Sequence, residues 1–562
     1  MRADRRTWRV LAALATLALI VSACGGGADD DSDADDDAGQ EDAGDDGEGD
    51  DGDGDDEGDD DGDAEAGGDL IVGTTDTVNS LDPAKIYDYY SSNILFNAGN
   101  TLVGFEPGET EVSPMLAEEM PEISEDGTVY TFNLRDDVTF HDGSQMTSED
   151  VKFSLERALN LNHPEGAAFL IGAIESIETP DDYTVEITLS EPNVTFLSRL
   201  AYTVATILPA DHYPAPDGEL GEDDDPEEYI EEELVATGPY QVTDFREGES
   251  ITLEANPDYW GDPPANDRVL VQFFSESAQL KAALEAGEVD IAYRDLDPQQ
   301  RADLEGNDQI QSVEGEGASI RYVVFNTFME PFDDPEVRQA FAAAVDRQRI
   351  LDEVLEGAGE PLYSMIPPGF ETSEPLFQEK YEGEDPASFL SDQETPIEIE
   401  LWYTTDHYGD TEPSIAQNIE RALEESDVFD VQLESSEWAE FTQDAWPGED
   451  ATYPSFLLGW YPDYFDPDDY IEPFYASGGF LGFYANEEMD ELIAAEQQVD
   501  DPAAAERDDV FADIQELAAE DVPLLPLYEE TPFAFVREGV EGVEDTMDPV
   551  QIFRYFEISV TE

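Results

Sequence analysis

The chain carries far more acidic than basic side chains, and this excess limits what it can fold into. It has 140 aspartates and glutamates against 23 lysines and arginines, a net charge of −117. Without its first 68 residues it still has 116 acids, 19 bases and a net charge of −97. Repulsion of this size destabilises a compact state in dilute buffer, whereas at about 1 M salt the screening length falls to about 3 Å. The composition predicts halophilic adaptation, with a polycation-binding surface as the alternative, and it excludes nucleic acid and anionic lipid as partners.

The first 24 residues have the pattern of a secretion signal. Four arginines within the first nine residues precede an apolar run, residues 10–23, which is too short to span a bilayer. Cys24, the only cysteine, follows directly. This ending resembles the lipobox of bacterial lipoproteins, which implies that Cys24 is lipidated and holds the protein on the extracytoplasmic side of the cytoplasmic membrane. The alternative is an ordinary signal peptide with an incidental cysteine.

Residues 25–68 are expected to be a disordered acidic tether. They hold 23 acids and no base, and alanine is their only apolar residue. Like charges along such a segment repel and extend it. A calcium-binding tail is the alternative, but the spacing of a calcium loop is missing. No later segment has 18 uninterrupted apolar residues, so we expect membrane attachment through lipid alone.

From Asp69 onward the sequence has the periodicity of a folded protein. Residues 130–134 and 183–189 alternate apolar and polar side chains, as half-buried strands do. Thr147 and Asp150 have the spacing of a capping box at the start of a helix.

A second helix is expected to start at Pro335 and to continue to Leu355. Because strands and helices alternate, the predicted fold class is α/β or α+β with mixed sheets. The chain has 562 residues, of which 40% are hydrophobic, so two or three lobes are expected.

The sequence contains no recognisable catalytic or metal-binding motif. Its four histidines are far apart in the sequence, and no zinc-protease, serine-hydrolase or phosphate-loop motif occurs. Pairs of acids are expected by chance at this composition. We therefore expect no enzymatic activity, no cofactor and no metal.

Three stretches resemble the peptide/nickel class (family 5) of extracytoplasmic solute-binding proteins: residues 114–151, 237–261 and 325–347. The resemblance implies a two-lobed receptor of the type II periplasmic-binding-protein fold, with mixed sheets flanked by helices and lobes that close by a hinge. It places the first lobe at 69–321 and 528–562, an extra subdomain at about 107–192, and the second lobe at 322–527.

The resemblance also implies a function. Such a receptor captures a small ligand, here a peptide, and delivers it to the permease and ATPase subunits of an ABC importer; we expect it to act as a monomer. A non-peptide cargo (a nickel chelate, an oligosaccharide or an organic cation) and a signalling sensor are the alternatives.

The segment from Gly459 to Pro467 resembles the ligand-binding segment of oligopeptide receptors. The resemblance implies that Asp463 grips the α-ammonium group of a peptide, that Gly459 and Tyr461 offer backbone hydrogen bonds, and that Trp460 forms a pocket wall. The alternative is that Asp463 belongs to a surface turn.

Two positions depart from this pattern. Pro462 removes a backbone donor, and Leu457 stands where these receptors can place an arginine that binds a carboxylate. A weaker similarity adds Ser319, Asn100 and Thr101 as backbone partners that face the cleft.

The charge generates the first prediction. Because salt screens the repulsion, the melting temperature should rise steeply between about 0.1 M and about 2 M NaCl. Thermal unfolding followed by circular dichroism measures it. A melting temperature that stays constant over this range would contradict halophilic adaptation.

The cysteine generates the second prediction. Cys24→Ala should release the protein from membranes or block its maturation, because the lipid would have no attachment point. Membrane fractionation with immunoblotting measures this. Equal membrane partitioning of the variant and the wild type would show that Cys24 is not the anchor.

Overall fold

The structure, a computed structural model, describes residues 68–213 and 234–561, apart from 295, 316, 392, 410, 446–451, 500–501, 548 and 550–551. The predicted signal, Cys24 and the tether lie outside the described residues. None of the described helices is both long and apolar enough to cross a membrane.

The first large sheet has seven strands and is built around β1 (Asp69–Thr74), which is parallel to both of its neighbours. The order across it is β12 (Ile310–Glu314), β19 (Phe533–Arg537), β11 (Ile291–Tyr293), β1, β10 (Arg268–Phe273), β9 (Ser250–Ala255) and β8 (Tyr240–Arg246). The remaining neighbours are antiparallel, so the sheet is mixed.

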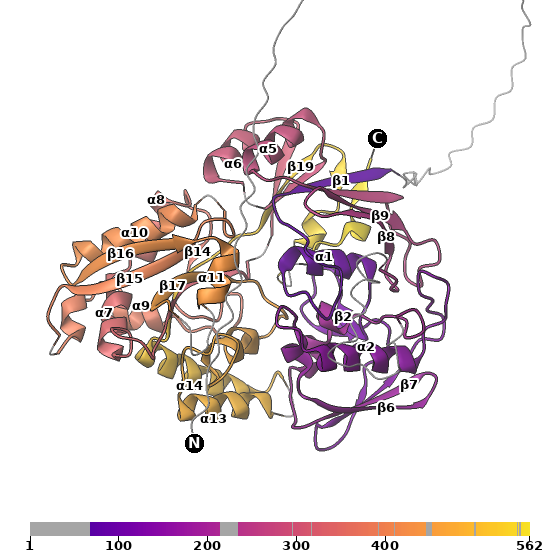
Figure 1. The fold of residues 1–562 in the computed structure, drawn as a ribbon, viewed down its shortest axis with the longest axis horizontal. Helices are drawn as coiled ribbons and strands as arrows, with labels where there is room; N and C mark the ends of the chain where they lie inside the picture. The colour runs from indigo at the N-terminus through magenta and orange to yellow at the C-terminus, as the bar shows by residue number, and fades with distance from the viewer. Residues whose placement is uncertain are drawn as a thin grey trace, which may run out of the picture. The chain divides into compact units, whose positions relative to one another are not determined.

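Helices cover both faces of this sheet because its strands alternate their side chains. On β19, Ala534 and Val536 join one buried cluster, whereas Phe535 joins another. The first cluster includes α1 (Tyr89–Ala98), and the second includes α5 (Ser277–Ala286) and α6 (Pro298–Glu305). Figure 1 shows α5 and α6 next to β19.

A smaller sheet and a long helix lie on the same side of the molecule as α1 (Figure 1). The sheet has the order β4 (Glu122–Ile123), β5 (Val129–Asn133), β7 (Thr184–Leu189) and β6 (Ile174–Asp181). The helix is α2 (Ser148–Leu161), and Thr147 and Asp150 form the predicted capping box. Short elements complete this part: β2 (Val103–Phe105), β3 (Val112–Pro114), α3 (Phe196–Leu200), β20 (Val540–Glu541) and β21 (Ser559–Val560).

The second large sheet has six strands, with β13 (Ile320–Phe325) near its centre. The order is β14 (Glu360–Pro361), β18 (Leu524–Glu529), β13, β17 (Ser455–Trp460), β15 (Ile397–Thr404) and β16 (Phe429–Ser436). Every residue of β13 is buried. Val323 and Phe325 join one hydrophobic cluster while Tyr322 and Val324 join another, so both faces are covered.

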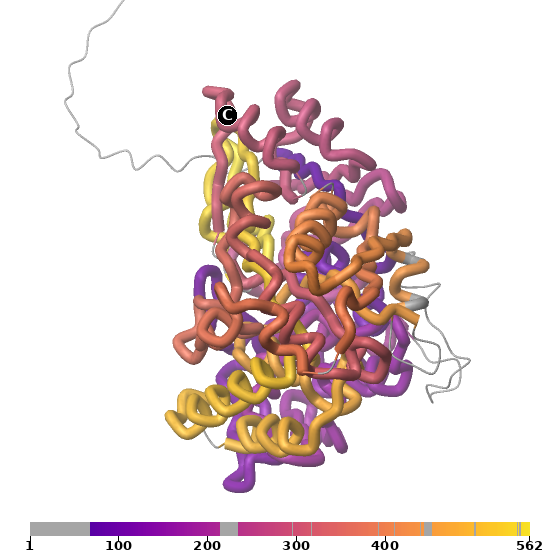
Figure 2. The backbone as a smooth tube through the Cα atoms, turned by 90° about the vertical axis from the view of Figure 1, so that its left-hand side faces the viewer, coloured from indigo at the N-terminus to yellow at the C-terminus, as the bar shows by residue number. Residues whose placement is uncertain are grey.

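The helices that cover this sheet come from the chain between β13 and β18. They are α7 (Pro335–Ala344), α8 (Arg347–Glu353), α9 (Leu376–Tyr381), α10 (Glu412–Glu425), α11 (Trp438–Ala445), α12 (Glu472–Tyr475), α13 (Glu487–Gln497) and α14 (Ala505–Asp521). In Figure 2 the gold helices α13 and α14 lie side by side.

The single helix expected from Pro335 to Leu355 is two helices, so this prediction is wrong. The start is as expected: Asp334 caps α7 and accepts a hydrogen bond from the N–H of Glu336. Val345 has extended backbone angles, and Asp346 caps α8 by accepting from the N–H of Arg349. A second capping residue thus ends the first helix and begins the next.

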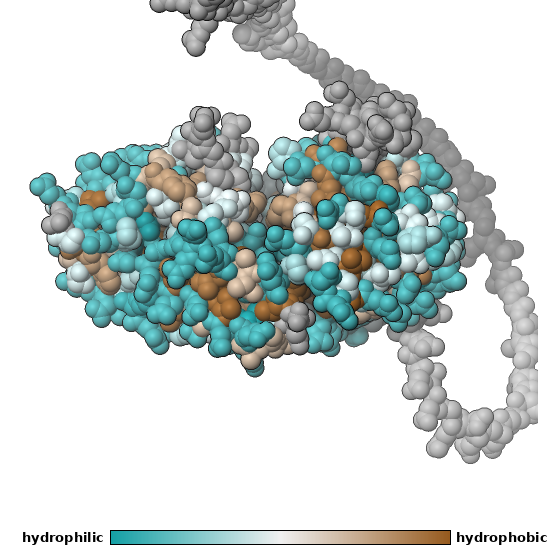
Figure 3. Space-filling view, turned by 90° about the horizontal axis from the view of Figure 1, so that it is seen from below, coloured by the Kyte–Doolittle hydropathy of each residue, from teal (hydrophilic) through white to brown (hydrophobic). Residues whose placement is uncertain are grey.

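The predicted fold class, α/β with mixed sheets and two lobes, is confirmed. We call the part with the seven-stranded sheet the first lobe and the part with the six-stranded sheet the second lobe. The chain changes sheets between Glu314 and Ile320 and again between Glu529 and Phe533. The exact lobe boundaries and the subdomain at 107–192 stay predictions. Polar residues cover most of the face seen in Figure 3, with scattered hydrophobic patches.

Candidate ligand-binding cavity

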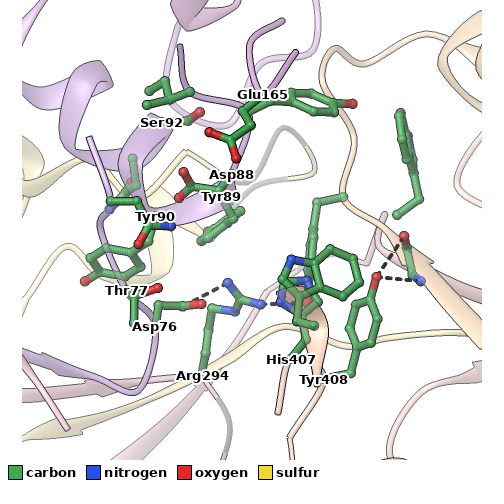
Figure 4. A pocket seen from close by; sticks show the side chains of 18 of the residues that line it. Asp76, Thr77, Asp88, Tyr89, Tyr90, Ser92, Glu165, Arg294, His407 and Tyr408 are labelled. Atoms are coloured by element: carbon green, nitrogen blue, oxygen red, sulfur yellow. Dashed lines mark hydrogen bonds and ion pairs between the residues drawn. The ribbon is translucent and has the colours of Figure 1, made fainter. Parts of the chain in front are cut away.

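A cavity of about 1610 Å³ is lined by residues from both lobes. Ligand pockets commonly have about 300–1,000 Å³, so this one has room for a ligand larger than a typical small molecule. The first lobe contributes mainly the connection between β1 and α1, and the second lobe contributes residues 405–409, residues 458–463 and Phe480. Figure 4 shows side chains of both lobes pointing into it.

The predicted binding segment begins where β17 ends. Trp460 is the last residue of this strand and pairs with Ile320 of β13. Its indole Nε1 donates to Asp469 Oδ2 at 3.0 Å, and the backbone N–H of Asp463 donates to the same oxygen at 3.1 Å. Asp469 therefore fixes the turn that brings Asp463 into the lining of the cavity.

The carboxylate of Asp463 receives a hydrogen bond from the other lobe. Tyr87 donates its hydroxyl to Asp463 Oδ2 at 2.8 Å. Burial raises the pKa of Asp463 to about 7, while the Tyr87 hydrogen bond and the charge of Arg199 act in the opposite direction. Burial and the neighbouring charge of Asp463 also raise the pKa of Asp469.

Position 459 favours glycine, because the space around its α-carbon is crowded. A Cβ atom there would lie 2.8 Å from Tyr408 Cε1 and 3.1 Å from Arg321 Cδ. Its N–H donates to the Tyr408 hydroxyl at 3.0 Å. Thus Gly459, Trp460, Tyr461 and Asp463 all line the cavity, and the N–H of Gly459 is bound by the Tyr408 hydroxyl there.

The structure does not bring Asn100, Thr101 and Ser319 into the lining. Asn100 Oδ1 accepts from Thr237 Oγ1 and from Trp260 Nε1, both at 3.1 Å. Thr101 donates its hydroxyl to the carbonyl of Val103. The carbonyl of Ser319 accepts from the N–H of Glu530 at 2.8 Å.

Leu457 does not reach the cavity either, because it is buried in the hydrophobic cluster on the opposite face of the six-stranded sheet from Trp460. β17 contains no arginine, so this strand offers no guanidinium group to bind a ligand carboxylate.

Sequence reasoning missed Arg294, which lies in the cavity between two aromatic rings. Its guanidinium carbon is 4.5 Å from the ring centre of Tyr89 and 4.7 Å from that of Tyr461. It donates to Asp76 Oδ2 at 2.9 Å and to the Tyr461 hydroxyl at 2.6 Å (Figure 4). Arg294 and Lys85 are the only arginine and lysine among the described lining residues. No local motif marks Arg294, since its partners come from distant segments.

A family model described as bacterial extracellular solute-binding proteins, family 5 Middle, matches residues 111–482, which is more than half of the chain. The chain belongs to family 5 of the bacterial extracellular solute-binding proteins. The predicted family is thereby confirmed.

Relatives of this family 5 protein carry the names of binding proteins. A dipeptide-binding protein of Pseudomonas aeruginosa is 28% identical and covers 85% of this chain and 93% of its own. Heme-binding protein A of Haemophilus influenzae is also 28% identical, over 79% of this chain and 83% of its own. The structure of DppA from Helicobacter pylori in complex with the peptide STSA has a TM-score of 0.78 and 26% identity, and it covers 89% of this chain and 99% of its own.

The raised pKa of Asp463 generates the third prediction. A carboxylate binds more protons when folded than when unfolded if folding raises its pKa, so it stabilises the protein less as pH rises from about 4 to above 7. Asp463→Asn removes this loss. The free energy of unfolding of the variant minus that of the wild type should therefore be about 2–4 kcal/mol larger at pH 8 than at pH 5. Denaturant unfolding of both proteins in molar salt at the two pH values measures it. An equal effect at both pH values would show that Asp463 does not titrate near 7.

Proposed function

We propose that this family 5 protein is the lipid-anchored, extracytoplasmic receptor of an ABC importer, which captures peptides between its two lobes and delivers them to the permease. One observation carries the proposal: a half-buried carboxylate, Asp463, lines a large cavity between the lobes. An ammonium group that binds there replaces water around a charge that burial has already made costly, so the charge-assisted hydrogen bond is strong.

The backbone beside Asp463 supports a peptide as the ligand. β15 pairs with β17 only through Trp402 and Phe456. The edge of β17 that faces β15 is therefore not paired with β15 beyond Phe456. At Gly459 the Tyr408 hydroxyl accepts the N–H that a neighbouring strand would otherwise accept. A ligand carbonyl can replace this hydroxyl and pair with β17 as an added strand. Such pairing gives affinity without selecting particular side chains.

The relatives support the same ligand class and one alternative. Several relatives are named for dipeptides or tripeptides, and the DppA structure contains a peptide. Others are named for different cargo: heme, and agropinic acid in a structure with 26% identity and a TM-score of 0.75. These names favour a non-peptide organic ligand as the second candidate. Among the described residues no cluster of three or more His, Cys, Asp or Glu side chains could hold a metal ion.

The anchor and the partners are part of the proposal. Lipidation at Cys24 would hold the receptor near its permease, and residues 25–68 would let it reorient. The receptor would act as a monomer, without catalysis. Permease and ATPase genes beside its own gene would support import; a signalling gene in their place would support a sensor.

Calorimetric titration of two peptides onto two proteins tests the ligand, and this is the fourth prediction. Asp463→Asn should weaken a free-amine dipeptide by about 1.5–3 kcal/mol, roughly 10- to 150-fold in Kd, because the charged acceptor is lost. The N-acetylated dipeptide should bind the wild type poorly and lose little more in the variant, which closes a double-mutant cycle.

Glu165→Gln is the matched control, because Glu165 also lines the cavity but is exposed and, among the described residues, forms no hydrogen bond or ion pair with Asp463. It should cost much less affinity than Asp463→Asn. Equal losses for both peptides in Asp463→Asn would show that Asp463 does not contact the amine. Tight binding of the acetylated peptide by the wild type would favour the non-peptide candidate.

A further inference from the structure

The hydrogen bond between Tyr87 and Asp463 joins residues 376 positions apart. Tyr87 belongs to the β1–α1 connection of the first lobe, and Asp463 follows β17 of the second lobe. The hydroxyl takes Oδ2 of Asp463, and no hydrogen bond to Oδ1 is found among the described residues. The carboxylate lines the cavity, so its second oxygen is the one available to a ligand.

Aromatic rings from both lobes hold the ring of Tyr87 in place. Its centre lies 5.2 Å from that of Phe169 and 6.2 Å from that of Tyr202 in the first lobe. It lies 5.6 Å from Phe480 and 6.3 Å from Trp460 in the second lobe. All four contacts are edge-to-face, an arrangement that aromatic pairs prefer. The ring therefore has little freedom to turn its hydroxyl away from Asp463.

The backbone that carries Tyr87 is fixed on both sides. Arg157 of α2 forms two hydrogen bonds with the carboxylate of Asp82, at 2.6 and 2.5 Å, and both side chains are buried. On the other side, Asp88 caps α1 by accepting from the N–H of Ser91 at 2.9 Å. The first lobe thus fixes the backbone segment that carries Tyr87.

We propose that Tyr87 is a positioning residue of the amine-binding subsite: it holds Oδ2 of Asp463 and turns Oδ1 toward the ligand's charged amine. The inference rests on the proposed function, because it takes Asp463 as the amine anchor. It deepens that function in one respect. The donor and the carboxylate come from different lobes, so the subsite is assembled only when the lobes are together. The ligand class that it selects is a primary amine.

Several charged and titratable groups interact with Asp463. Tyr87 and Tyr202 approach from the first lobe, together with Arg199 of α3, while Asp469 lies on η4 (Pro467–Tyr470) of the second lobe, next to Asp468. Among these, Tyr87 donates directly to the carboxylate and lowers its pKa. Loss of this donor disfavours the ionised form, which is the form that binds an amine.

Tyr87→Phe tests the inference, because phenylalanine keeps the ring and its aromatic contacts. In ligand-free protein the titration midpoint of Asp463 should rise by about one to two pH units, the equivalent of one hydrogen bond to a charged group. Tryptophan fluorescence measured against pH follows this titration, because Trp460 and the backbone N–H of Asp463 both donate to Asp469. Subtracting the curve of Asp463→Asn from that of the wild type isolates the contribution of Asp463. At pH 7 the affinity for a free-amine dipeptide should fall about 10- to 100-fold, and that for its N-acetylated form should stay unchanged.

Tyr484→Phe is the matched control. Tyr484 also donates its hydroxyl to a carboxylate, Asp521 Oδ2, at 2.5 Å, but neither residue lines the cavity. This variant should shift neither the Asp463 titration nor the affinity.

Two results would overturn the inference. One is an unchanged titration midpoint in Tyr87→Phe. The other is an equal loss of affinity for both peptides, which would mean that Tyr87 merely supports the local fold. If the wild type binds no free-amine peptide, the proposed function fails, but the ligand-free titration still decides whether Tyr87 positions Asp463.

Discussion

A buried ion pair between the lobes fixes the segment on which the candidate site depends. Arg199 of α3 donates to Asp468 Oδ2 at 2.5 Å, with side-chain exposures of 9% and 0%. Tyr464 donates to the same oxygen at 2.9 Å, and Gln497 donates to Oδ1 at 3.1 Å. Burial alone would raise the pKa of Asp468, but the charge of Arg199 and hydrogen bonds with Glu496, Arg199 and Gln497 hold it below its usual range. Removing one partner of such a pair costs about 3–5 kcal/mol, and Asp463 lies five residues before Asp468, so its position follows from this contact.

The ion pair also shows how a chain so poor in bases uses them. Arg157, Arg199, Arg321 and Arg507 each pair with a carboxylate in the interior. Salt screens exposed charges far more than buried ones. Molar salt can therefore relieve the surface repulsion while these interior pairs keep their strength. The acidic composition and the architecture are compatible for this reason, and the two pairs at Asp466 and Asp468 hold the C-terminal end of the predicted binding segment.

Local chemistry made part of the fold predictable from the sequence. The capping box at Thr147 and the start of α7 at Pro335 each depend on a few neighbouring residues. The cavity position of Asp463 was predicted instead from the resemblance to a receptor family. The split between α7 and α8 was missed because the apolar period continues through Val345 although the backbone does not. Arg294 and Tyr87 could not be predicted, because their partners are brought to them by the tertiary fold across 167 and 376 positions.

The arrangement around Asp463 links stability to binding. Burial makes the ionised carboxylate unfavourable, and the cation of the proposed ligand would remove part of that unfavourable interaction on binding. A fully solvated carboxylate would not destabilise the free protein in this way, and it would gain little from a ligand. Tyr87 limits the penalty without satisfying the charge, because one hydroxyl replaces the several waters that donate to a carboxylate in solution. Under the proposed function, the affinity of this site for a cation would therefore come from the incomplete solvation of Asp463, which residues of both lobes bury.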